Sequence, residues 1–535
     1  MNEALYSNWR VELGRHWKLL LVFFALCAFA AGVTAPLADP DLPIHLATGE
    51  WVVRHHSVPF VEPWAWTRSG APFYAYSWGI ETIYFLLYRS WGPTGLQVLQ
   101  GIIYVGIVGA ILFLGVVARW RAWTTIGMIL IQILITVGVS AFLRPQSILL
   151  LVTPVAWGLV ILAAETEQIA TVLVLLVLNS AVLANSHLLF PITLAPCVFL
   201  LAHPPTDRKR FLLIPCAIVL GWFITPYALH WVAIYKQNFA PNAMFGPPSP
   251  ISEYRPGFTS AATLGISSVL LAIPFAFLPW VAAPRFISLE RLLHGLLWLA
   301  GLLMFALATR AMVVWWLLIL PMVAAVLELV PSPRNSTVRV TQIGMLVAVF
   351  AALALSGVDD VQDPWMGAGS IATRRLPSLN ARSMEPIAEW LDCNVKRAVG
   401  GRLVTTFNLG GYVPWRLPYL SESIDGRTIF PDSVAKADTY FSPNRATVPL
   451  PPWRSAELAI APIYVPVAAV LDTAKGWHRI ALTSQVSGRA GLIGLWVTDK
   501  WWARAGTVAL PTHVIALPHV IVRQGTNHFA CGPSV

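Results

Sequence analysis

Long apolar runs separated by short polar stretches dominate the first two thirds of the chain. A helix needs about 17–25 predominantly apolar residues to cross a bilayer, and most of the runs reach that length. They predict eleven membrane spans, with a break at Gly92-Pro93 in the second: residues 19–37, 80–117, 122–142, 146–163, 168–186, 188–203, 211–231, 262–283, 292–308, 311–330 and 339–357. The run 188–203 is short and could be re-entrant.

The first run is interpreted as a retained span. It could also be a signal peptide, but no small-residue cleavage pattern separates it from the acidic residues that follow. Basic residues recur in alternate loops of this topology, on the side of the N-terminus. They are Arg119, Arg121, the run 208–210, Arg285, Arg291, Arg334 and Arg339. This asymmetry predicts a cytoplasmic N-terminus and places residues 39–81 outside.

After Gly357 the composition changes, because acidic residues appear and no later run reaches membrane length. We expect a transmembrane domain at 1–357 and an extracytoplasmic soluble α+β domain at 358–535. A helix is predicted at 383–395 with Ser383 as its N-cap, and strands at 402–408, 421–430, 466–471 and 491–499. The pairs Gly410-Gly411 and Asp425-Gly426 are interpreted as turns, the first for its positive φ. The sequence leaves open whether Cys393 and Cys531 pair.

Composition agrees with a polytopic α-helical membrane protein. Of 535 residues, 56% are hydrophobic and 12% charged, and the mean hydropathy is +0.65. The formal charge of +10 is explained by basic cytoplasmic loops and by attraction to anionic membrane lipids. No Lys/Arg-rich run of the nucleic-acid-binding type is present, so no nucleic-acid partner is expected.

The candidate chemistry lies in residues 39–81. Asp39 and Asp41 directly follow the first span, and His45 comes one helical turn after Asp41. Glu62 and Glu81 follow in the same segment. Ionisable groups at a membrane edge are costly and point to function. The alternative is a solvated loop whose acidic residues only cap helices.

The motifs of this segment resemble a bacterial branch of the GT-C superfamily of integral-membrane glycosyltransferases, related to polyprenyl-phosphate-sugar-dependent mannosyl and aminoarabinose transferases. The resemblance is carried by Asp39-Pro40-Asp41, His45-Leu46-Ala47-Thr48-Gly49-Glu50-Trp51, Val61-Glu62-Pro63-Trp64 and Ser77-Trp78-Gly79-Ile80-Glu81. Further similarity lies at 144–146, 185–187, 225–227, 251–254, Arg310, 408–412 and 424–427. Glu62 stands where an Asp is usual, and Leu188 replaces a usual Gly.

The resemblance implies a glycosyltransferase, expected to be inverting, that acts at the outer face of a bacterial cytoplasmic membrane. Its donor would be a polyprenyl-phosphate-linked sugar and its acceptor a lipid or glycan. The expected catalytic residues are Asp39, Asp41 and Glu62, with Asp41 as the base. Asp39 or Glu62 would orient Asp41 or help to hold a metal.

The expected substrate-binding residues are His45, Glu81, Arg144, Asn185, His187, Glu253 and Arg310. Arg144 and Arg310 are candidates for the donor phosphate, although an arginine at the interface can simply snorkel. His45 could be a metal ligand, an acceptor contact or a plain interfacial histidine. A divalent metal ion, with Asp41 and His45 as ligands, remains open.

Two other classes of protein fit many spans with polar ends. One is a lipid or glycan transporter or flippase, although no internal repeat and no matching pair of Gly/Pro-broken spans is found. The other is a non-catalytic membrane assembly protein whose C-terminal domain binds a partner. An enzyme should lose its product on Asp41→Asn substitution, whereas a transporter or an assembly protein should be unaffected.

Overall fold

The computed structural model describes the chain in several segments. They are residues 17–34, 37, 39, 41–139, 143–205, 207–239, 289–307, 311–329, 379–425, 427, 429–430, 455–463, 465–483 and 492–517. These residues form two compact units. The first contains residues 1–35, 97–232 and 246–361, and the second contains 36–96, 233–245 and 362–535. The predicted loop 39–81 therefore packs with the C-terminal domain, and the predicted boundary at 357/358 lies outside the described residues.

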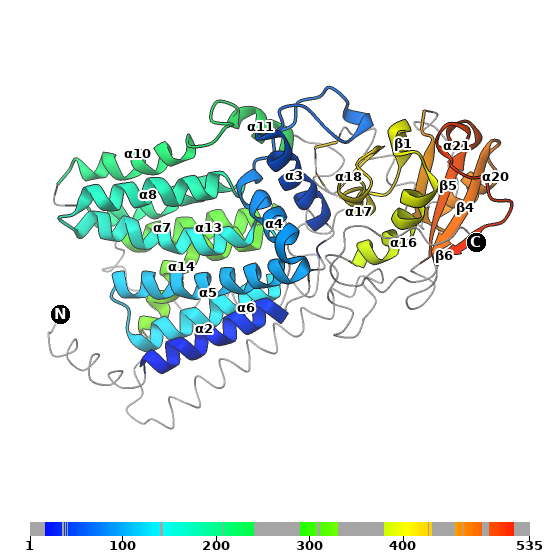
Figure 1. Cartoon of the computed structure of the whole chain (residues 1–535). Helices are drawn as coiled ribbons and strands as arrows, with labels where there is room; N and C mark the ends of the chain where they lie inside the picture. Colours follow the sequence, from blue (N-terminus) through cyan, green and yellow to red (C-terminus); the bar gives the residue numbers. More distant parts are fainter. Residues whose placement is uncertain are drawn as a thin grey trace. The chain divides into compact units, whose positions relative to one another are not determined.

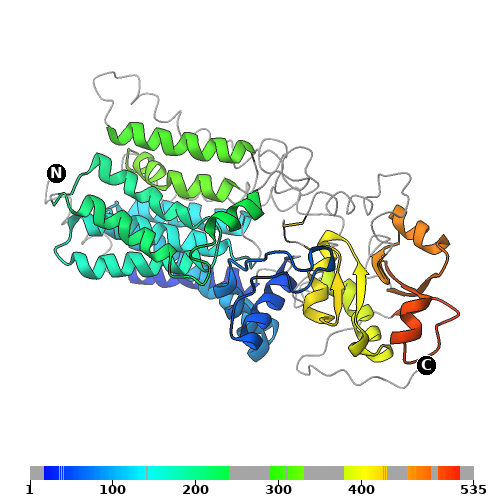
Figure 2. The same cartoon turned by 90° about the horizontal axis from the view of Figure 1, so that it is seen from above.

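The first unit is a bundle of apolar helices that lie side by side in both views (Figures 1 and 2). Its long helices are α2 (Trp17–Thr34), α5 (Pro93–Val117), α6 (Ala122–Val139), α7 (Ser147–Glu165), α8 (Ile169–Ala184), α10 (Arg210–Trp222), α13 (Leu289–Leu307) and α14 (Met312–Leu329). Among the described helices, α5 and α7 are long and apolar enough to cross a bilayer by length and composition. The predicted count of eleven is not confirmed, and the predicted spans 262–283 and 339–357 lie outside the described residues.

Three predicted spans have a different local structure. In the predicted span 211–231 the helix α10 already ends at Trp222. Residues 188–203 do not form one α-helix: a 3₁₀ helix, η2 (Phe190–Val198), leads into the short α9 (Phe199–Ala202). Pro191 and Pro196 lack the N–H groups that a continuous α-helix would use there. The predicted break at Gly92-Pro93 is confirmed, because α4 (Trp78–Trp91) ends at Gly92 with φ +60° and α5 begins at Pro93. The segment 80–91 packs in the second unit and not in the bundle.

The C-terminal domain is built on a six-stranded mixed sheet of order β2-β1-β3-β5-β4-β6. The strands are β1 (Gly401–Val404), β2 (Leu420–Glu422), β3 (Leu458–Pro462), β4 (Trp477–Thr483), β5 (Ile493–Thr498) and β6 (Ile515–Leu517). β1 runs parallel to β2 and β3, whereas β5 is antiparallel to β3 and β4, and β6 is parallel to β4. Apolar side chains bury both faces of the sheet.

One face of the sheet packs against α16 (Leu379–Asn394), α18 (Tyr412–Arg416) and α21 (Asp499–Ala505). The other face packs against α20 (Pro466–Thr473), and Figure 1 labels these elements. The expected combination of helices and a C-terminal sheet is confirmed. The expected strand 466–471 is wrong, because this segment is α20, with Pro466 at the start, where its fixed φ favours a helix.

Three smaller expectations also need correction. Residues 407–410 form the short helix α17 and are not part of a strand. Ser383 lies inside α16 and is not its N-cap. Gly410 does not have a positive φ; an added Cβ would instead lie 1.7 Å from the Ile424 carbonyl oxygen. Cys393 is disulfide-bonded, and Cys531 lies outside the described residues.

Helices α3 (Leu42–His55) and α4 form the part of the second unit that carries the acidic segment. They approach very closely at one point, where a Cβ built on Gly49 would lie 2.1 Å from the Glu81 carbonyl oxygen and 2.8 Å from the Phe85 Cβ. Only glycine fits this contact. Because His45 is one turn before Gly49 on the same helix face, the contact brings His45 to Glu81.

We predict that Gly49→Ala forces α3 and α4 apart, because a backbone carbonyl cannot rotate away from the new methyl group. Overpacking of this kind costs about 1–3 kcal/mol, so the melting temperature of the purified protein in detergent should fall. The matched control is Gly109→Ala in α5, where an added Cβ meets nothing within 4 Å and alanine is the better helix former. Equal melting temperatures for the two variants would contradict the close contact.

Candidate active site

Asp39 and Asp41 stand where the chain enters α3. Asp39 is fully buried, and its Oδ1 accepts a hydrogen bond from the Asp41 backbone N–H at 3.0 Å. Asp41 is the N-cap residue of α3, but its side chain does not cap the helix. The interpretation that these acidic residues only cap a helix therefore does not hold for Asp41, whose half-buried carboxylate is not used by the first turn of α3.

His45 lies on the next turn of α3 and faces α4. Its Nδ1 is 2.7 Å from Glu81 Oε1, and the two side chains are 18% and 7% exposed. Burial lowers the pKa of His45, but the hydrogen bond to Glu81 and the charges of Glu81, Asp41 and Asp39 outweigh it, so the pKa is raised. His45 is therefore an imidazolium in slightly acidic solution, and it compensates part of the local negative charge.

Tyr84 was not predicted from the sequence, and it completes this group of side chains. It is fully buried, its ring packs edge-on against His45 with centroids 6.4 Å apart, and its hydroxyl has no hydrogen-bond partner among the described residues. Burial and the charges of Asp39 and Glu81 raise its pKa well above 10, so it stays a neutral donor. The available signal was its position three residues after Glu81, on the same helix face.

Glu62 belongs to a second cluster, on the loop between α3 and α4. We call residues 56–77 the first loop. The Glu62 side chain is fully buried and forms a bidentate pair with Arg427, with Nη1–Oε2 at 2.9 Å and Nη2–Oε1 at 3.0 Å. Its Oε1 also accepts from the backbone N–H groups of Trp64 and Ala65 at 3.0 and 3.1 Å. Through these contacts the Glu62 carboxylate holds the first loop in place.

Arg427 is held by further groups of the C-terminal domain. Its Nε lies 2.9 and 2.8 Å from the two carboxylate oxygens of Asp425. The guanidinium carbon lies 5.0 Å from the Trp64 ring centroid, 4.6 Å from that of Phe73 and 5.8 Å from that of Phe430. Burial lowers the pKa of Arg427, but the carboxylates outweigh it and the net shift is upward. The Asp425–Arg427 segment is thus more than the structural turn expected from its sequence.

The charges of this cluster balance if one carboxyl group is neutral. Glu62 and Asp425 face Arg427, and the Arg68 guanidinium interacts with the same groups. Glu422 is fully buried beside them, and neither of its carboxyl oxygens has a hydrogen-bond partner among the described residues. Burial, then the nearby charge of Asp425, raises the pKa of Glu422 well above its usual range. With a neutral Glu422, the charges of two carboxylates and two guanidinium groups would balance.

Other hydrogen bonds attach the first loop to the same domain. Trp66 Nε1 donates to the Leu403 carbonyl oxygen at 3.2 Å, and Thr67 Oγ1 donates to the Ser423 carbonyl oxygen at 2.6 Å. Arg68 donates to the Ile429 carbonyl oxygen. Leu403 lies near the end of β1, and Ser423 and Ile429 follow β2, so the loop is fixed at the carboxyl ends of these two strands.

The helical unit contains three more of the predicted residues. Arg144 lies in the turn before α7, where its carbonyl oxygen accepts from Ser147 N–H at 3.0 Å. Asn185 ends α8 and donates from Nδ2 to the carbonyl oxygens of Ala181 and Ile224 at 2.8 and 2.7 Å. His187 is buried, and its Nδ1 accepts from Leu189 N–H at 3.1 Å. Glu253 and Arg310 lie outside the described residues.

The sequence left open a divalent metal with Asp41 and His45 as ligands. His45 directs Nδ1 at Glu81, and within the described segments no three His, Cys, Asp or Glu side chains are grouped as a metal site. A divalent metal at Asp41 and His45 stays a prediction.

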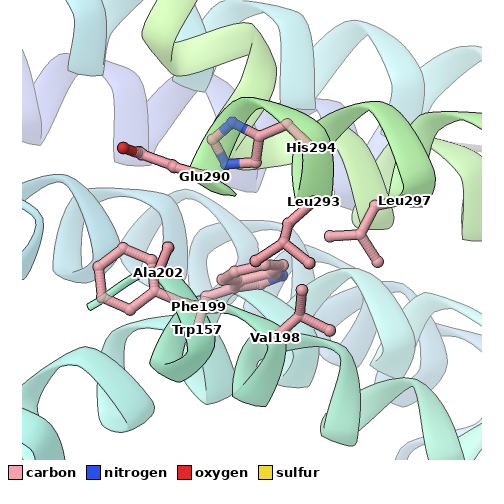
Figure 3. Close-up of a pocket in the computed structure, with 8 residues that line it drawn as sticks. All are labelled: Trp157, Val198, Phe199, Ala202, Glu290, Leu293, His294 and Leu297. Carbon is pink, nitrogen blue, oxygen red and sulfur yellow. The ribbon is translucent and has the colours of Figure 1, made fainter. Parts of the chain in front are cut away.

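The helical unit also has an apolar pocket (Figure 3). It is lined by Trp157, Val198, Phe199, Ala202, Glu290, Leu293, His294 and Leu297. Glu290 Oε2 lies 3.4 Å from His203 Nε2. None of the lining residues belongs to the group around Asp41, His45 and Glu81.

We predict that the His45–Glu81 pair makes stability depend on pH. Because the folded-state pKa of His45 is raised, its contribution is complete below its unfolded pKa of 6.5 and is lost as the pH rises through the folded pKa. Glu81→Gln should lower the melting temperature most near pH 6, by the equivalent of about 1–2 kcal/mol, and much less near pH 9. His55→Gln, on the exposed end of α3, is the control. A Glu81→Gln effect that does not change between these pH values would contradict the pair.

No protein-family model matches the chain, and no curated protein matches it significantly. Its fold is similar to that of solved membrane glycosyltransferases. The apo oligosaccharyltransferase of Archaeoglobus fulgidus aligns with a TM-score of 0.56 and 10% identity, over 84% of this chain and 70% of the other. The same organism's AglB, in complex with an inhibitory peptide and a dolichol-phosphate, aligns with a TM-score of 0.55 and 10% identity over the same shares.

A bacterial structure covers the chain more fully. ArnT from Cupriavidus metallidurans, bound to undecaprenyl phosphate, aligns with a TM-score of 0.52 and 13% identity, over 91% of this chain and 98% of the other. At these identities the similarity concerns the fold. The chain therefore shares its fold with an archaeal oligosaccharyltransferase and with ArnT, and the expected polytopic helical fold agrees with this similarity.

Proposed function

We propose that the chain is a glycosyltransferase that moves a sugar from a polyprenyl-phosphate donor to a lipid or glycan acceptor at the outer face of a bacterial cytoplasmic membrane. The observation that carries the proposal is the Asp39–Asp41–His45–Glu81 group, in which Asp41 presents a carboxylate that does not cap its helix. The fold adds support, because two of the similar structures hold dolichol-phosphate or undecaprenyl phosphate.

In the proposed reaction Asp41 acts as the base. It takes the proton of an acceptor hydroxyl or amine as that atom forms a bond to the anomeric carbon of the sugar. The bond between this carbon and the donor phosphate oxygen breaks, and the polyprenyl phosphate leaves with the electron pair. Attack from the face opposite the phosphate would invert the anomeric centre. Arg144 and Arg310 are the candidates for stabilising the charge on the departing phosphate.

The remaining polar residues have supporting roles in this proposal. Asp39 orients the chain at Asp41 by accepting the Asp41 N–H. Glu81 holds the imidazolium of His45, which lies one turn from Asp41 and limits the repulsion between the carboxylates. Asn185 and His187 are proposed to contact the substrate.

We predict that Asp41→Asn abolishes sugar transfer while the protein remains folded, because the amide keeps the shape of the carboxylate but cannot accept the proton. Loss of a positioned general base reduces rates by about 10²–10⁴-fold. The assay follows radiolabel from a pool of polyprenyl-phosphate sugars into acceptors, in membranes carrying either form. Glu50→Gln is the matched control, since Glu50 pairs with Arg54 on the outside of α3 and should transfer normally.

Two results would overturn the proposal. Transfer by Asp41→Asn at the wild-type rate would exclude Asp41 as the base. No transfer by abundant, folded wild-type protein from any donor would favour a transporter or an assembly protein. The same assay with a chelator tests the metal: loss of wild-type transfer, restored by added divalent cation, would establish a requirement.

A further inference from the structure

The buried Glu62–Arg427 pair is not used by the proposed chemistry and needs an explanation of its own. Its side chains are 0% and 12% exposed, and taking such charges out of water is costly. The two residues are 365 positions apart in the chain. A pair of this kind is weak evidence for stability but can fix one particular arrangement of the chain.

The arrangement that it fixes includes the candidate active site. The first loop joins the end of α3 to the start of α4, and these two helices carry Asp41, His45, Glu81 and Tyr84. Both helices also contact the C-terminal domain directly. An added Cβ on Gly411 would lie 3.3 Å from Ile44 Cβ, and the Tyr88 ring packs edge-on against Trp415 with centroids 5.4 Å apart. The domain thus holds the loop and the two helices that it connects.

We infer that Arg427 is a positioning residue for the proposed glycosyl transfer. Through Glu62 it attaches the first loop to the C-terminal domain and so keeps Asp41 and His45 in their working geometry. The inference rests on the proposed function. It also gives Glu62 a different role from a base: the carboxylate holds the loop and does not touch the substrate.

The chemistry of the pair favours arginine specifically. The guanidinium donates to both Glu62 oxygens and both Asp425 oxygens while its faces lie against aromatic rings. Lysine offers a point charge without this planar fork. Arg427→Lys should therefore keep the charge balance and loosen the loop. Arg427→Met should release the loop and leave Glu62 and Asp425 without their cation.

The chain contains a probe for release of the loop. The Arg68–Ser69 bond lies in the first loop, where the Arg68 guanidinium is bound to the Ile429 and Pro72 carbonyl oxygens. Trypsin must extract this guanidinium in order to cleave, so the wild-type bond should be protected. The Lys475–Gly476 bond, in an exposed turn between α20 and β4, serves as the internal reference.

The first experiment compares full-length wild type, Arg427→Lys, Arg427→Met and Arg397→Met in detergent. Arg397 pairs with Asp392 at the surface and is 61% exposed, so its variant should match wild type in both assays. Arg427→Met should raise trypsin cleavage after Arg68 at least tenfold relative to cleavage after Lys475. It should also lower kcat for sugar transfer by about 10–100-fold, with KM for the donor within about twofold, as expected when reacting groups are misplaced. Arg427→Lys should lie between.

The second experiment separates positioning from base catalysis. Glu62→Gln retains an oxygen for the Trp64 and Ala65 N–H groups and is close in volume, so it should fold even if Arg427→Met does not. If Glu62 only positions the loop, the transfer rate of Glu62→Gln still falls at acidic pH as in wild type, which is the acidic limb of the pH–rate profile. Only the maximal rate is lower. Loss of that limb would instead identify Glu62 as the base and overturn the inference.

Two further outcomes would overturn the inference about Arg427. Wild-type kcat in an Arg427→Met protein whose loop is cleaved would show that loop attachment does not serve transfer. Unchanged protection of Arg68 in both Arg427 variants would show that Arg427 does not hold the loop. Failure of the proposed function is recognised separately, because wild type would then show a protected Arg68 but no transfer from any donor.

Discussion

The arrangement of the second structural unit depends on neutralising one buried guanidinium, that of Arg427. Arg427 is enclosed by aromatic rings and can be charged there only because carboxylates from two distant parts of the chain meet it. One is Asp425, two residues earlier, and the other is Glu62, in the first loop. Loss of the cation would leave both carboxylates buried and unpaired. The first loop and the C-terminal domain are therefore held together by this cluster of charges. The α3–α4 pair is attached to that unit and carries the candidate active site.

The same contacts explain what the C-terminal sheet does. In open α/β sheets, ligands commonly bind beyond the carboxyl ends of parallel strands. Here β1 and β2 are parallel, and the carbonyl oxygens of Leu403 and Ser423 near those ends bind Trp66 and Thr67 of the chain itself. The first loop therefore occupies the edge at which a small molecule would usually be sought. The domain is better understood as a scaffold for the loop than as a separate ligand-binding module.

The features that sequence patterns predicted are those with a local cause. Apolar runs marked the bundle helices, and Gly92-Pro93 marked the break before α5 because a left-handed glycine and a proline punctuate helices. The spacing of Asp41 and His45 placed them one turn apart. The segment 466–471 was wrongly predicted to be a strand. Its valines and alanines suit a buried strand, whereas Pro466 and the packing against the sheet make it a helix.

The features that could not be predicted depend on contacts between distant segments. From the sequence, Glu62 was grouped with the other acidic residues of the segment 39–81, because nothing in its neighbourhood indicates a pair with Arg427. Tyr84 lies in an apolar helix and carries no motif, so its place beside His45 emerges only when α3 and α4 pack. That packing depends on Gly49, whose role is visible only from the backbone it meets.

The distance in sequence between Glu62 and Arg427 also sets an order of events during biosynthesis. Ribosomes add about 5–20 residues per second, so a ribosome reaches Arg427, which is 365 positions after Glu62, about 20–70 s later. During that time the bundle can insert into the membrane while Glu62 stays hydrated, without its partner. The first loop can reach its final conformation only after the C-terminal domain has been made. A nascent or truncated chain would therefore contain the helical bundle without an ordered candidate active site, and that site would form last.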